Sequence, residues 1–366
     1  MQENKIGETE AIVLLTTIMT GKIFLTFPNT MVGYGGNASW LIILFSGCLA
    51  LILFSFILRF LNKFGGNSFP ESAENIAGPY LGTMIVLAVL LPWLIDVAMT
   101  LRKFSEMMVI IALPETPISV MVITFIVASA IVAYLGVNTI SRAAYLSFPL
   151  SLGAVLFIII LTYPAWNLDW LFPLLGKGLD PILRYGILRS SDYGELNLLY
   201  AIPLIFYSQQ IKRIGYKSIV LTMLIFLVVI ITYLLTFPAV VGEEPYLPLY
   251  MMARGVYLGR FLQRIEAVFV LFWVINGYLW ISIGIYGFCK ILCDLLRLPD
   301  YRPLILPTAI LILAISFIPA SLPDVVLFSI YTYREYSFIL IFGIPALLLL
   351  IAHLRGKGVP AENEAK

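Results

Sequence analysis

Residues 41–58 read LIILFSGCLALILFSFIL, a run without a single charged side chain. A helical membrane span needs about 20 mostly apolar residues, because each residue advances ~1.5 Å through a hydrocarbon core of about 30 Å. Similar stretches recur almost from end to end, separated by short polar turns rich in Pro and Gly. Transmembrane β-strands would instead give alternating segments of about ten residues. The sequence therefore predicts an integral membrane protein built from α-helices.

The overall composition points the same way. Apolar residues make up 61% of the 366 residues and charged residues only 12%, and the mean hydropathy is +0.97. A water-soluble domain could not bury so large an apolar fraction. The polar, acidic residues 1–10 lead directly into a full-length apolar segment, whereas a cleaved signal peptide has a basic leader and a small-residue cleavage site. The first apolar segment is therefore expected to remain as a membrane helix.

Hydropathy and the positions of Pro, Gly and charged residues divide the chain into about ten membrane helices. The expected helices lie near residues 10–33, 38–61, 80–112, 117–135, 141–165, 195–211, 217–241, 258–296, 302–319 and 334–354. The third and eighth are longer than an upright crossing of about 30 Å requires, so they are expected to tilt or protrude. We predict a single membrane domain over residues 1–366 that ends in a short cytoplasmic tail, 355–366.

Basic residues are distributed unevenly between the two sets of loops, which predicts the orientation because Lys and Arg favour cytoplasmic loops. With both termini inside, the cytoplasmic set contains Lys5, Arg59, Lys63, Arg142, Lys212, Arg213, Lys217, Lys290, Arg297, Arg302, Arg355, Lys357 and Lys366. The opposite set contains Lys177, Arg184, Arg189, Arg254, Arg260, Arg264 and Arg334, interspersed with acidic residues. The bias predicts that both termini are cytoplasmic. Two long external loops, 166–194 and 242–257, are each expected to carry a short amphipathic helix.

The residues needed for common catalytic or metal chemistry are missing from the sequence. His353 is the one histidine, and the three cysteines are Cys48, Cys289 and Cys293. A cysteine pair four residues apart without further Cys or His is a poor zinc site, and a lone histidine near the C-terminus cannot complete a Ser/His/Asp triad. The glycines of residues 33–36 follow no strand, so they do not predict a nucleotide-binding loop. We predict a protein that is not an enzyme and that holds no cofactor and no metal ion.

Lys22 is the charged residue that most requires an explanation. It lies about twelve residues into the first predicted helix, ~18 Å along its axis and so near the bilayer midplane. A charge there costs ~2.5–3.5 kcal/mol or more. Asp96 lies near the middle of the third helix, so we predict an ion pair between Lys22 and Asp96 that acts in ligand binding or in cation-linked switching. The alternative is that the two side chains extend to the membrane surface or only tie two helices together.

Three further charged residues inside the predicted helices are candidates for ion pairing or coupling: Arg102, Glu106 and Glu266. Arg102 and Glu106 are four residues apart and share one helical face, which predicts a mainly structural pair along the helix. Glu266 lies near the outer end of the eighth helix, close to two arginines. Its role can equally be structural or functional.

Two predicted helices contain residues that weaken a regular helix. Gly21 and Pro28 lie in the first helix, and Pro203 lies inside the sixth, where it removes a backbone hydrogen bond. Divided five and five, the helices form repeats over about 10–165 and 195–354, and each interruption falls in the first helix of its repeat. Inverted-repeat transporters build a midplane site from such broken helices. The predicted substrate-binding residues are Thr20, Gly21, Lys22, Ile23, Trp93, Asp96, Leu199, Tyr200, Pro203 and Asn276.

Four motifs occur together in this chain: GKIFLTFP at 21–28, RKFSE at 102–106, LPETP at 113–117 and QRIEAVF at 263–269. With Trp273 and the loop 167–178, they resemble the spore germination permease family. That family provides the B subunit of GerA-type germinant receptors and is related to amino acid/polyamine/organocation transporters. The resemblance covers essentially the whole chain, and its most specific parts are the LPETP turn and the Arg-Ile-Glu stretch.

The resemblance implies a LeuT-like, all-α bundle of ten helices in the spore inner membrane, with a 5+5 inverted repeat. A small nutrient, usually an amino acid, would bind where helices one and six unwind, beside helices three and eight. The implied partners are a larger A-type membrane subunit and a C-type lipoprotein, with no nucleic acid. Lys22 departs from the family pattern, which places a small residue there, so the ligand's identity does not follow from the resemblance. A proton-coupled amino acid transporter is the alternative function, whereas a scaffold would not need a midplane lysine.

Overall fold

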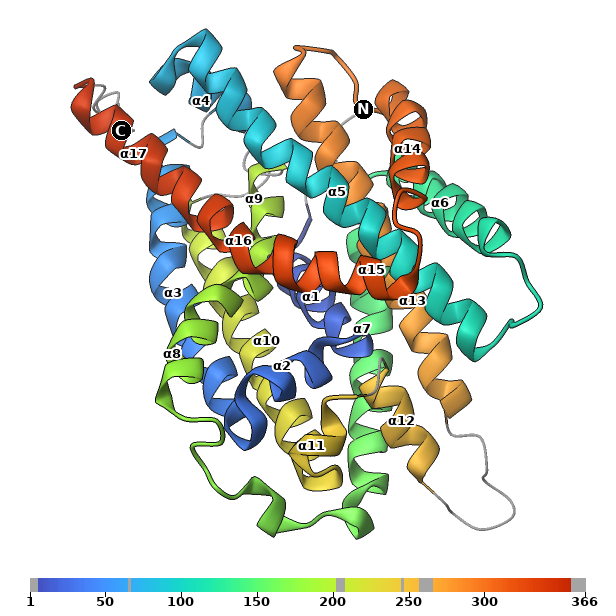
Figure 1. Cartoon of the computed structure of the whole chain (residues 1–366). Coiled ribbons are helices and arrows are strands. Elements are labelled where there is room, and N and C mark those ends of the chain that lie inside the picture. The colour runs from blue at the N-terminus through green and yellow to red at the C-terminus, as the bar shows by residue number, and fades with distance from the viewer. Residues whose placement is uncertain (1–5, 65–66, 202–207, 245–246, 257–265, 357–366) are drawn as a thin grey trace.

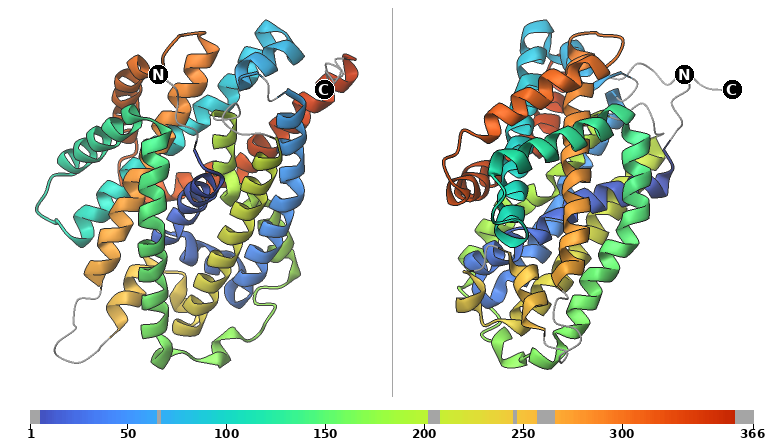
Figure 2. Two further views of the ribbon diagram at one scale, coloured as in Figure 1. Left: turned by 180° about the vertical axis from the view of Figure 1, so that it is seen from behind. Right: turned by 90° about the vertical axis from the view of Figure 1, so that its right-hand side faces the viewer.

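The computed structural model describes residues 6–64, 67–201, 208–244, 247–256 and 266–356. Within these ranges the regular secondary structure is helical, and the long helices run side by side in one bundle (Figure 1, Figure 2). By length and composition, the helices of the described residues that can cross a membrane are Phe27–Phe64, Pro79–Ile111, Ile118–Leu135, Val137–Leu161, Gln210–Thr236, Val270–Leu295 and Leu322–Leu354. The chain is therefore a multi-pass helical membrane protein. The count of ten crossings stays a prediction, because α14 (Arg302–Ser316), for example, is apolar but shorter than these spans.

The first helix is interrupted where the sequence predicts it. α1 (Glu8–Thr20) continues as the 3-10 turn η1 (Gly21–Phe24), and a regular helix resumes only at α2 (Phe27–Gly35). The Oγ1 of Thr20 donates to the carbonyl oxygen of Thr16 at 2.7 Å, a bond that competes with the regular helical pattern. Pro28 stands in the first turn of α2, where its missing N–H is not needed. These residues leave a short stretch of irregular backbone inside the bundle.

The second interruption lies earlier in the chain than the sequence predicts. The sixth helix is formed by α8 (Leu179–Leu188), the irregular 3-10 segment η5 (Arg189–Asn197) and α9 (Leu198–Ala201), with non-helical backbone angles at Tyr193. The predicted external loop 166–194 therefore contains α8 and most of η5, so helical structure begins well before residue 195, where the sequence predicts it. A run of charged residues lowered the local hydropathy and concealed the helix. Pro203, the predicted site of the interruption, lies outside the described residues.

The last membrane helix also begins earlier than predicted, at Leu322 instead of about 334. It consists of α15 (Leu322–Leu327), the π-helical η7 (Phe328–Arg334), α16 (Glu335–Phe338), the π-helical η8 (Ile339–Gly343) and α17 (Ile344–Leu354). The hydroxyl of Ser321 caps its first turn by accepting from the backbone N–H of Asp324. Arg334, which the sequence assigned to the external set, therefore lies in the middle of this helix.

Helix α13 (Glu266–Leu295) occupies the middle of the bundle and packs against α5, α6 and α7. Its glycines allow α5 to come close, as is common for small residues in membrane helices. A Cβ added at Gly284 would lie 2.6 Å from Val97 Cγ2, and one added at Gly287 would lie 2.5 Å from Trp93 Cζ2. This contact fixes the face of α5 that points into the bundle. The other long helices are α3 (Ser39–Phe64), α5 (Pro79–Ile111), α6 (Ile118–Leu135), α7 (Val137–Leu161) and α10 (Ser208–Thr236).

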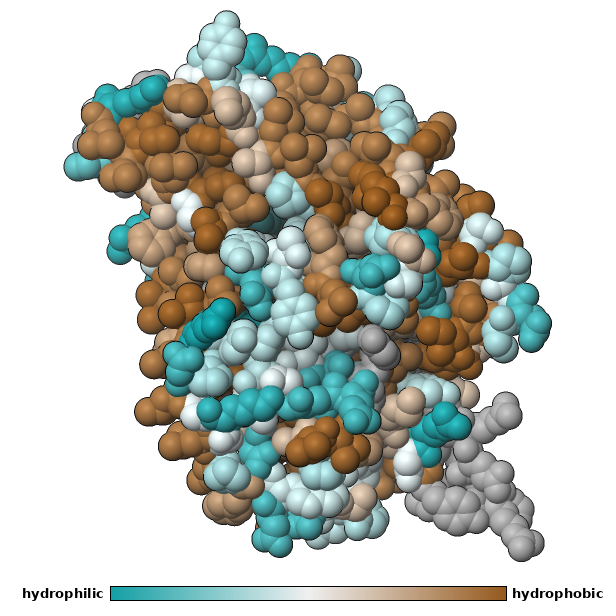
Figure 3. Space-filling view, viewed as in Figure 1, coloured by the Kyte–Doolittle hydropathy of each residue, from teal (hydrophilic) through white to brown (hydrophobic). Residues whose placement is uncertain are grey.

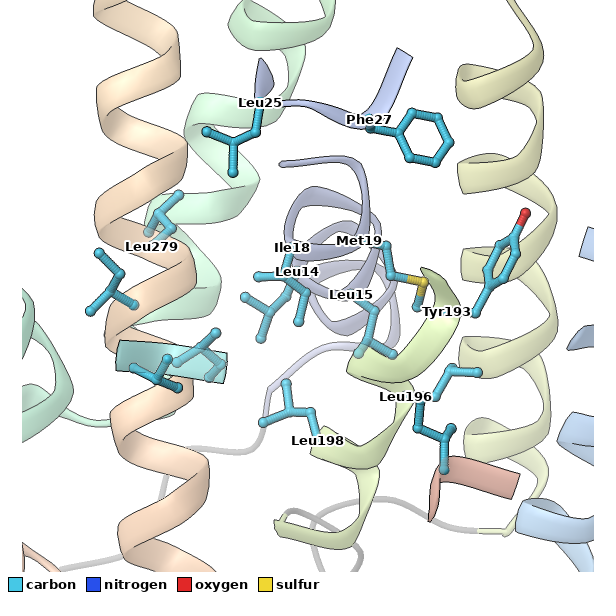
Figure 4. Packing of buried hydrophobic residues seen from close by; sticks show 14 of the residues in the cluster. Leu14, Leu15, Ile18, Met19, Leu25, Phe27, Tyr193, Leu196, Leu198 and Leu279 are labelled. Atoms are coloured by element: carbon cyan, nitrogen blue, oxygen red, sulfur yellow. The ribbon is translucent and has the colours of Figure 1, made fainter. Parts of the chain in front are cut away.

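The interrupted first helix lies inside the bundle. α1 packs against α7, α10 and η5, and Figure 4 shows Leu15 and Ile18 of α1 among side chains of the sixth helix and α13. Lys22 follows directly from this buried turn of helix. The sequence thus places a charged residue at the centre of an apolar core.

One end of the bundle is more polar than its flanks. The short segments η3 (Tyr163–Ala165), η4 (Leu168–Leu171), α11 (Ala239–Gly242) and α12 (Pro248–Gly255) lie at this polar end. The short helix α4 (Phe69–Ala77) lies at the opposite end. Figure 3 shows hydrophilic residues gathered over the lower half of one face, around α2 and α11, and hydrophobic residues above them. Elsewhere the helices expose large apolar side chains such as Leu146 and Leu306. Exposed apolar surface of this extent is suited to lipid.

Candidate ligand site between the two interrupted helices

Lys22 connects the two interrupted helices. Its Nζ lies 2.9 Å from Oε2 of Glu195 and donates to the backbone carbonyl oxygen of Asp192 at 2.5 Å. Both acceptors belong to η5, the irregular segment of the sixth helix. Lys22 is 9% exposed, so the pair lies away from solvent. The Asp192 carbonyl accepts this bond from within an irregular 3-10 segment, next to the non-helical backbone of Tyr193.

Arg334 extends this pair to the third helix. Its Nη1 lies 3.6 Å from Oε1 of Glu195, and its Nη2 lies 3.7 Å from Oδ2 of Asp96. Each of these side chains is at most 12% exposed. The ion pairs therefore join Lys22, Glu195, Arg334 and Asp96 into one chain, which we call the central charge network.

The predicted direct pair between Lys22 and Asp96 is wrong, because each group has a different partner. Glu195 reaches Lys22 from η5, and Asp96 faces Arg334. The physical reason is the position of two helix boundaries that the sequence did not reveal. The sixth helix unwinds at η5, and the last helix begins a dozen residues earlier than predicted, so that its arginine meets α5.

Arg189 forms a second buried pair beside the network. Its Nε and Nη2 donate to the two carboxylate oxygens of Asp192 at 2.9 and 2.8 Å. A two-point contact of this kind fixes the orientation of the guanidinium. The remaining nitrogen, Nη1, is buried and has no hydrogen-bond partner among the described residues.

Two cavities border the central charge network, and both are lined by Trp280 and Arg334. The space between the lining atoms, including the part open to solvent, is about 710 Å³ in the first and about 550 Å³ in the second. Along α5, residues 89–96 line the first cavity and residues 100–104 line the second. Along the last helix the order is reversed, as expected for an antiparallel neighbour: the second cavity is lined from Ser329 to Arg334 and the first from Tyr333 to Ile341. The cavities are therefore stacked along the bundle, with Arg334 at the boundary.

Several buried polar atoms at these cavities have no hydrogen-bond partner among the described residues. At the first cavity they include Asp96 Oδ1, Glu195 Oε1 and Asn197 Oδ1, all acceptors. At the second they are Arg189 Nη1 and Ser329 Oγ. Buried polar groups are normally satisfied by protein, water or ligand. The two cavities therefore offer polar contacts to a small molecule.

Four of the predicted binding residues line the cavities. Gly21 and Lys22 border the second, and Trp93 and Asp96 border the first. Gly21 has room around it, since an added Cβ would meet only Trp280 Cδ1, at 4.0 Å. The interruption of the first helix therefore contributes directly to the candidate site.

The other described binding candidates lie outside the cavity walls. Thr20 and Ile23 are buried in the core beside the interruption. Leu199 and Tyr200 are buried in α9, where the Tyr200 ring stacks on Phe69 at 4.6 Å between centroids. Their side chains face the core because η5, and not the segment around Pro203, supplies the irregular backbone.

Asn276 is used to join two helices. Its Nδ2 donates to Ser151 Oγ at 2.9 Å and to the backbone oxygen of Phe272 at 2.8 Å. The first bond links α13 to α7. Asn276 lines neither cavity and its amide nitrogen is already bonded, so the structure does not bring it into the candidate site.

Arg102 and Glu106 are in contact, as their spacing predicts. Arg102 Nε donates to Glu106 Oε1, and Arg102 Nη1 reaches the backbone oxygen of Ser316 at 3.3 Å. The guanidinium also lies over the ring of Phe317, 5.4 Å from its centroid. These contacts tie α5 to the end of α14, which supports a structural role. The side chain of Glu266 lies outside the described residues.

Sequence reasoning did not select Arg189, Asp192, Glu195, Lys103 or Arg334 as site residues. Two signals could have found most of them. The charged residues 189, 192 and 195 are spaced by three, which places them on one face of a helical turn. Ser321 and Asp324 form a helix-start pattern followed by apolar residues, which predicts a helix well before Arg334.

Comparison with known proteins agrees with this fold. Spore germination protein B2 of Bacillus subtilis (strain 168) is 20% identical over 359 residues, covering 97% of each chain. Spore germination protein A2 of the same organism is 23% identical and covers 96% of each chain. Among solved structures, Mhp1, a nucleobase-cation-symport-1 family transporter in a closed conformation with bromovinylhydantoin bound, has a TM-score of 0.68 at 12% identity. That match covers 97% of this chain and 94% of the transporter, so the two share a fold.

A family model settles the relationship. The model, described as Spore germination protein, matches residues 5–325. The match spans both interrupted helices and ends just inside the last membrane helix. The chain therefore belongs to the spore germination protein family, which confirms the resemblance found in its sequence.

Proposed function

We propose that the chain is the nutrient-sensing subunit of a spore germination receptor and that it binds a small molecule, an amino acid, between its two interrupted helices. The observation that carries the proposal is the contact of Lys22 with Glu195 and the Asp192 carbonyl, which joins the irregular backbone of both helices next to two cavities. A ligand that enters here can shift this contact, and both helices with it. Family membership supplies the germination context.

Several wider features belong to the same proposal. The chain crosses the spore inner membrane ten times as a 5+5 inverted repeat over about 10–165 and 195–354, and it works with an A-type membrane subunit and a C-type lipoprotein. The shared fold with Mhp1, a transporter solved with a small molecule bound, supports the transporter-like architecture. Sensing requires only that the ligand bind one arrangement of the bundle more tightly than another.

The Gly21→Leu variant tests the site. A Cβ added at Gly21 would lie 4.0 Å from Trp280 Cδ1, so the rest of a leucine side chain would fill part of the second cavity. Because overpacking costs about 1–3 kcal/mol, we expect affinity for the bound L-amino acid to fall about tenfold or more. The measurement is binding of a panel of radiolabelled L-amino acids to purified protein in nanodiscs.

Gly33→Leu is the matched control, since a Cβ at Gly33 in α2 meets nothing within 4 Å. The Gly33→Leu variant should bind the amino acid with the same affinity as the unmodified protein. If the Gly21→Leu variant also binds with unchanged affinity, the ligand does not occupy this site.

Active transport is the second candidate function. The stacking of two cavities on either side of Arg334 favours it, because a transporter must expose its site to each side in turn. Uptake by the purified chain in liposomes separates the two functions. Binding without accumulation of the labelled amino acid supports a sensor, whereas accumulation driven by a proton gradient supports a transporter.

We also propose that both termini face the cytoplasm. Basic residues at that end of the bundle include Arg213 and Lys217, which lie 3.7 and 3.5 Å from the carboxylate of Glu8. In a variant without native cysteines, an impermeant thiol reagent applied from outside should label Asp169→Cys in η4. It should spare Asp300→Cys, which lies between α13 and α14. The reverse labelling would show that the orientation is inverted.

A further inference from the structure

We propose that the second cavity is an anion subsite, in which Lys103 and Arg189 bind a carboxylate or another singly charged anionic group of the ligand. The inference rests on the proposed function, since it assumes that a small molecule occupies this region. It goes beyond that function by assigning a chemical class to part of the ligand and a binding role to Lys103 of α5 and Arg189 of η5.

Lys103 is the first observation. It lines the second cavity and is only 6% exposed. Within the described ranges it has no ion pair and no hydrogen bond, although the nearest acid on its own helix, Glu106, is paired with Arg102. A buried ammonium without a partner is costly. Its position therefore calls for a partner that is not part of the described chain.

Arg189 is the second observation, and it is independent of the first. The Asp192 carboxylate holds Nε and Nη2, so the guanidinium is fixed and Nη1 is left without a partner among the described residues. Arg189 also lines the second cavity and is 4% exposed. Ser329 adds a buried hydroxyl that likewise lacks a partner there. The unsatisfied groups at this cavity can all donate hydrogen bonds.

The balance of charge gives the third observation. The cations around the two cavities are Lys22, Lys103, Arg189 and Arg334, and the anions are Asp96, Asp192 and Glu195. Four positive groups and three negative groups leave one positive charge in excess, and the ion pairs account for every member except Lys103. One singly charged anionic group would neutralise this excess. A cationic group would instead add to it, so the cavity selects against cationic groups.

The test compares amino acids with their amides, in which a neutral carboxamide group replaces the carboxylate. The thermal unfolding temperature of the purified chain in nanodiscs is measured with a panel of L-amino acids and with the corresponding L-amino acid amides. At least one amino acid should raise the unfolding temperature, and its amide should not. Lys103→Met should lose about 10- to 100-fold in affinity for that amino acid, as expected for a lost hydrogen bond to a charged group. Lys103→Arg, which keeps the charge, should retain most of the affinity.

Two controls separate binding from folding and from general electrostatics. Without ligand, Lys103→Met should unfold at the same or a higher temperature, because it removes an unpaired buried charge. Lys217→Met removes a charge from an exposed lysine far from the cavities and should bind like the unmodified protein.

The outcomes distinguish this inference from the proposed function. If an amino acid and its amide stabilise the protein equally, or if Lys103→Met binds with unchanged affinity, the anion subsite is wrong while the ligand site stands. If no compound of either panel changes the unfolding temperature, the proposed function fails and the subsite fails with it.

Discussion

Replacing Lys22 with methionine is expected to destabilise the protein by about 3–5 kcal/mol, because it breaks the shorter of the two buried ion pairs of Glu195 and leaves that carboxylate only Arg334, 3.6 Å away. Lys22 lies 2.9 Å from Glu195, and the two side chains are 10% and 9% exposed. Glu195→Gln should cause a similar loss. The double variant should lose less than the sum of the two single losses, because the interaction is removed only once. Unfolding of purified protein in detergent, followed for all four proteins, measures this difference.

A partly exposed pair provides the control for that cycle. Lys290 and Asp294 are 2.8 Å apart on α13, with side chains 31% and 19% exposed. Pairs of this kind contribute at most about 1 kcal/mol, so Lys290→Met should have a small effect. Strictly additive losses for Lys22→Met and Glu195→Gln would show that the two groups do not interact.

Arg334→Met should be at least as destabilising, because one guanidinium faces two buried carboxylates. Removing it leaves Asp96 and Glu195 without that positive charge, at a cost of about 3–5 kcal/mol for a broken buried pair. Ligand response should be lost as well, since Arg334 borders both cavities. Adding Asp96→Asn to Arg334→Met should recover part of the stability.

Arg302 offers a closely matched comparison. It lies 3.7 Å from Asp300, the same separation as between Arg334 and Asp96. The side chains of Arg302 and Asp300 are 40% and 46% exposed, whereas those of Arg334 and Asp96 are each 12% exposed. Arg302→Met should therefore change stability by less than about 1 kcal/mol. Equal effects of Arg302→Met and Arg334→Met would mean that burial does not strengthen the network.

The family and the helical membrane architecture could be read from the sequence, because both depend on features that are local in the chain. The break in the first helix is also local: Gly21 and Pro28 weaken the helix wherever it packs. Lys22 was recognised for the same reason, since a charge among apolar residues has a cost that does not depend on its neighbours.

The partners of Lys22 and Asp96 could not be read in this way. Charged residues lower the hydropathy of η5, and Pro323, Asp324 and the pair Arg334 and Glu335 interrupt the last apolar segment, so both regions looked like external loop. Which side chains then meet depends on how α5, η5 and the last helix pack, and this is a property of the tertiary structure. Asn276 shows the converse, since its polar side chain looked available for a ligand but bonds to Ser151 of α7.

The central claim is that a small molecule binds between the irregular segments of the first and sixth helices. The most direct measurement is an experimental structure of the purified chain at a saturating concentration of the L-amino acid that raises its unfolding temperature most, compared with the structure without it. We predict new density bordered by Gly21 and Lys22 on one side and by η5 on the other, with an anionic group near Lys103. Ligand density elsewhere in the bundle or on its surface, with this region unchanged, would contradict the claim.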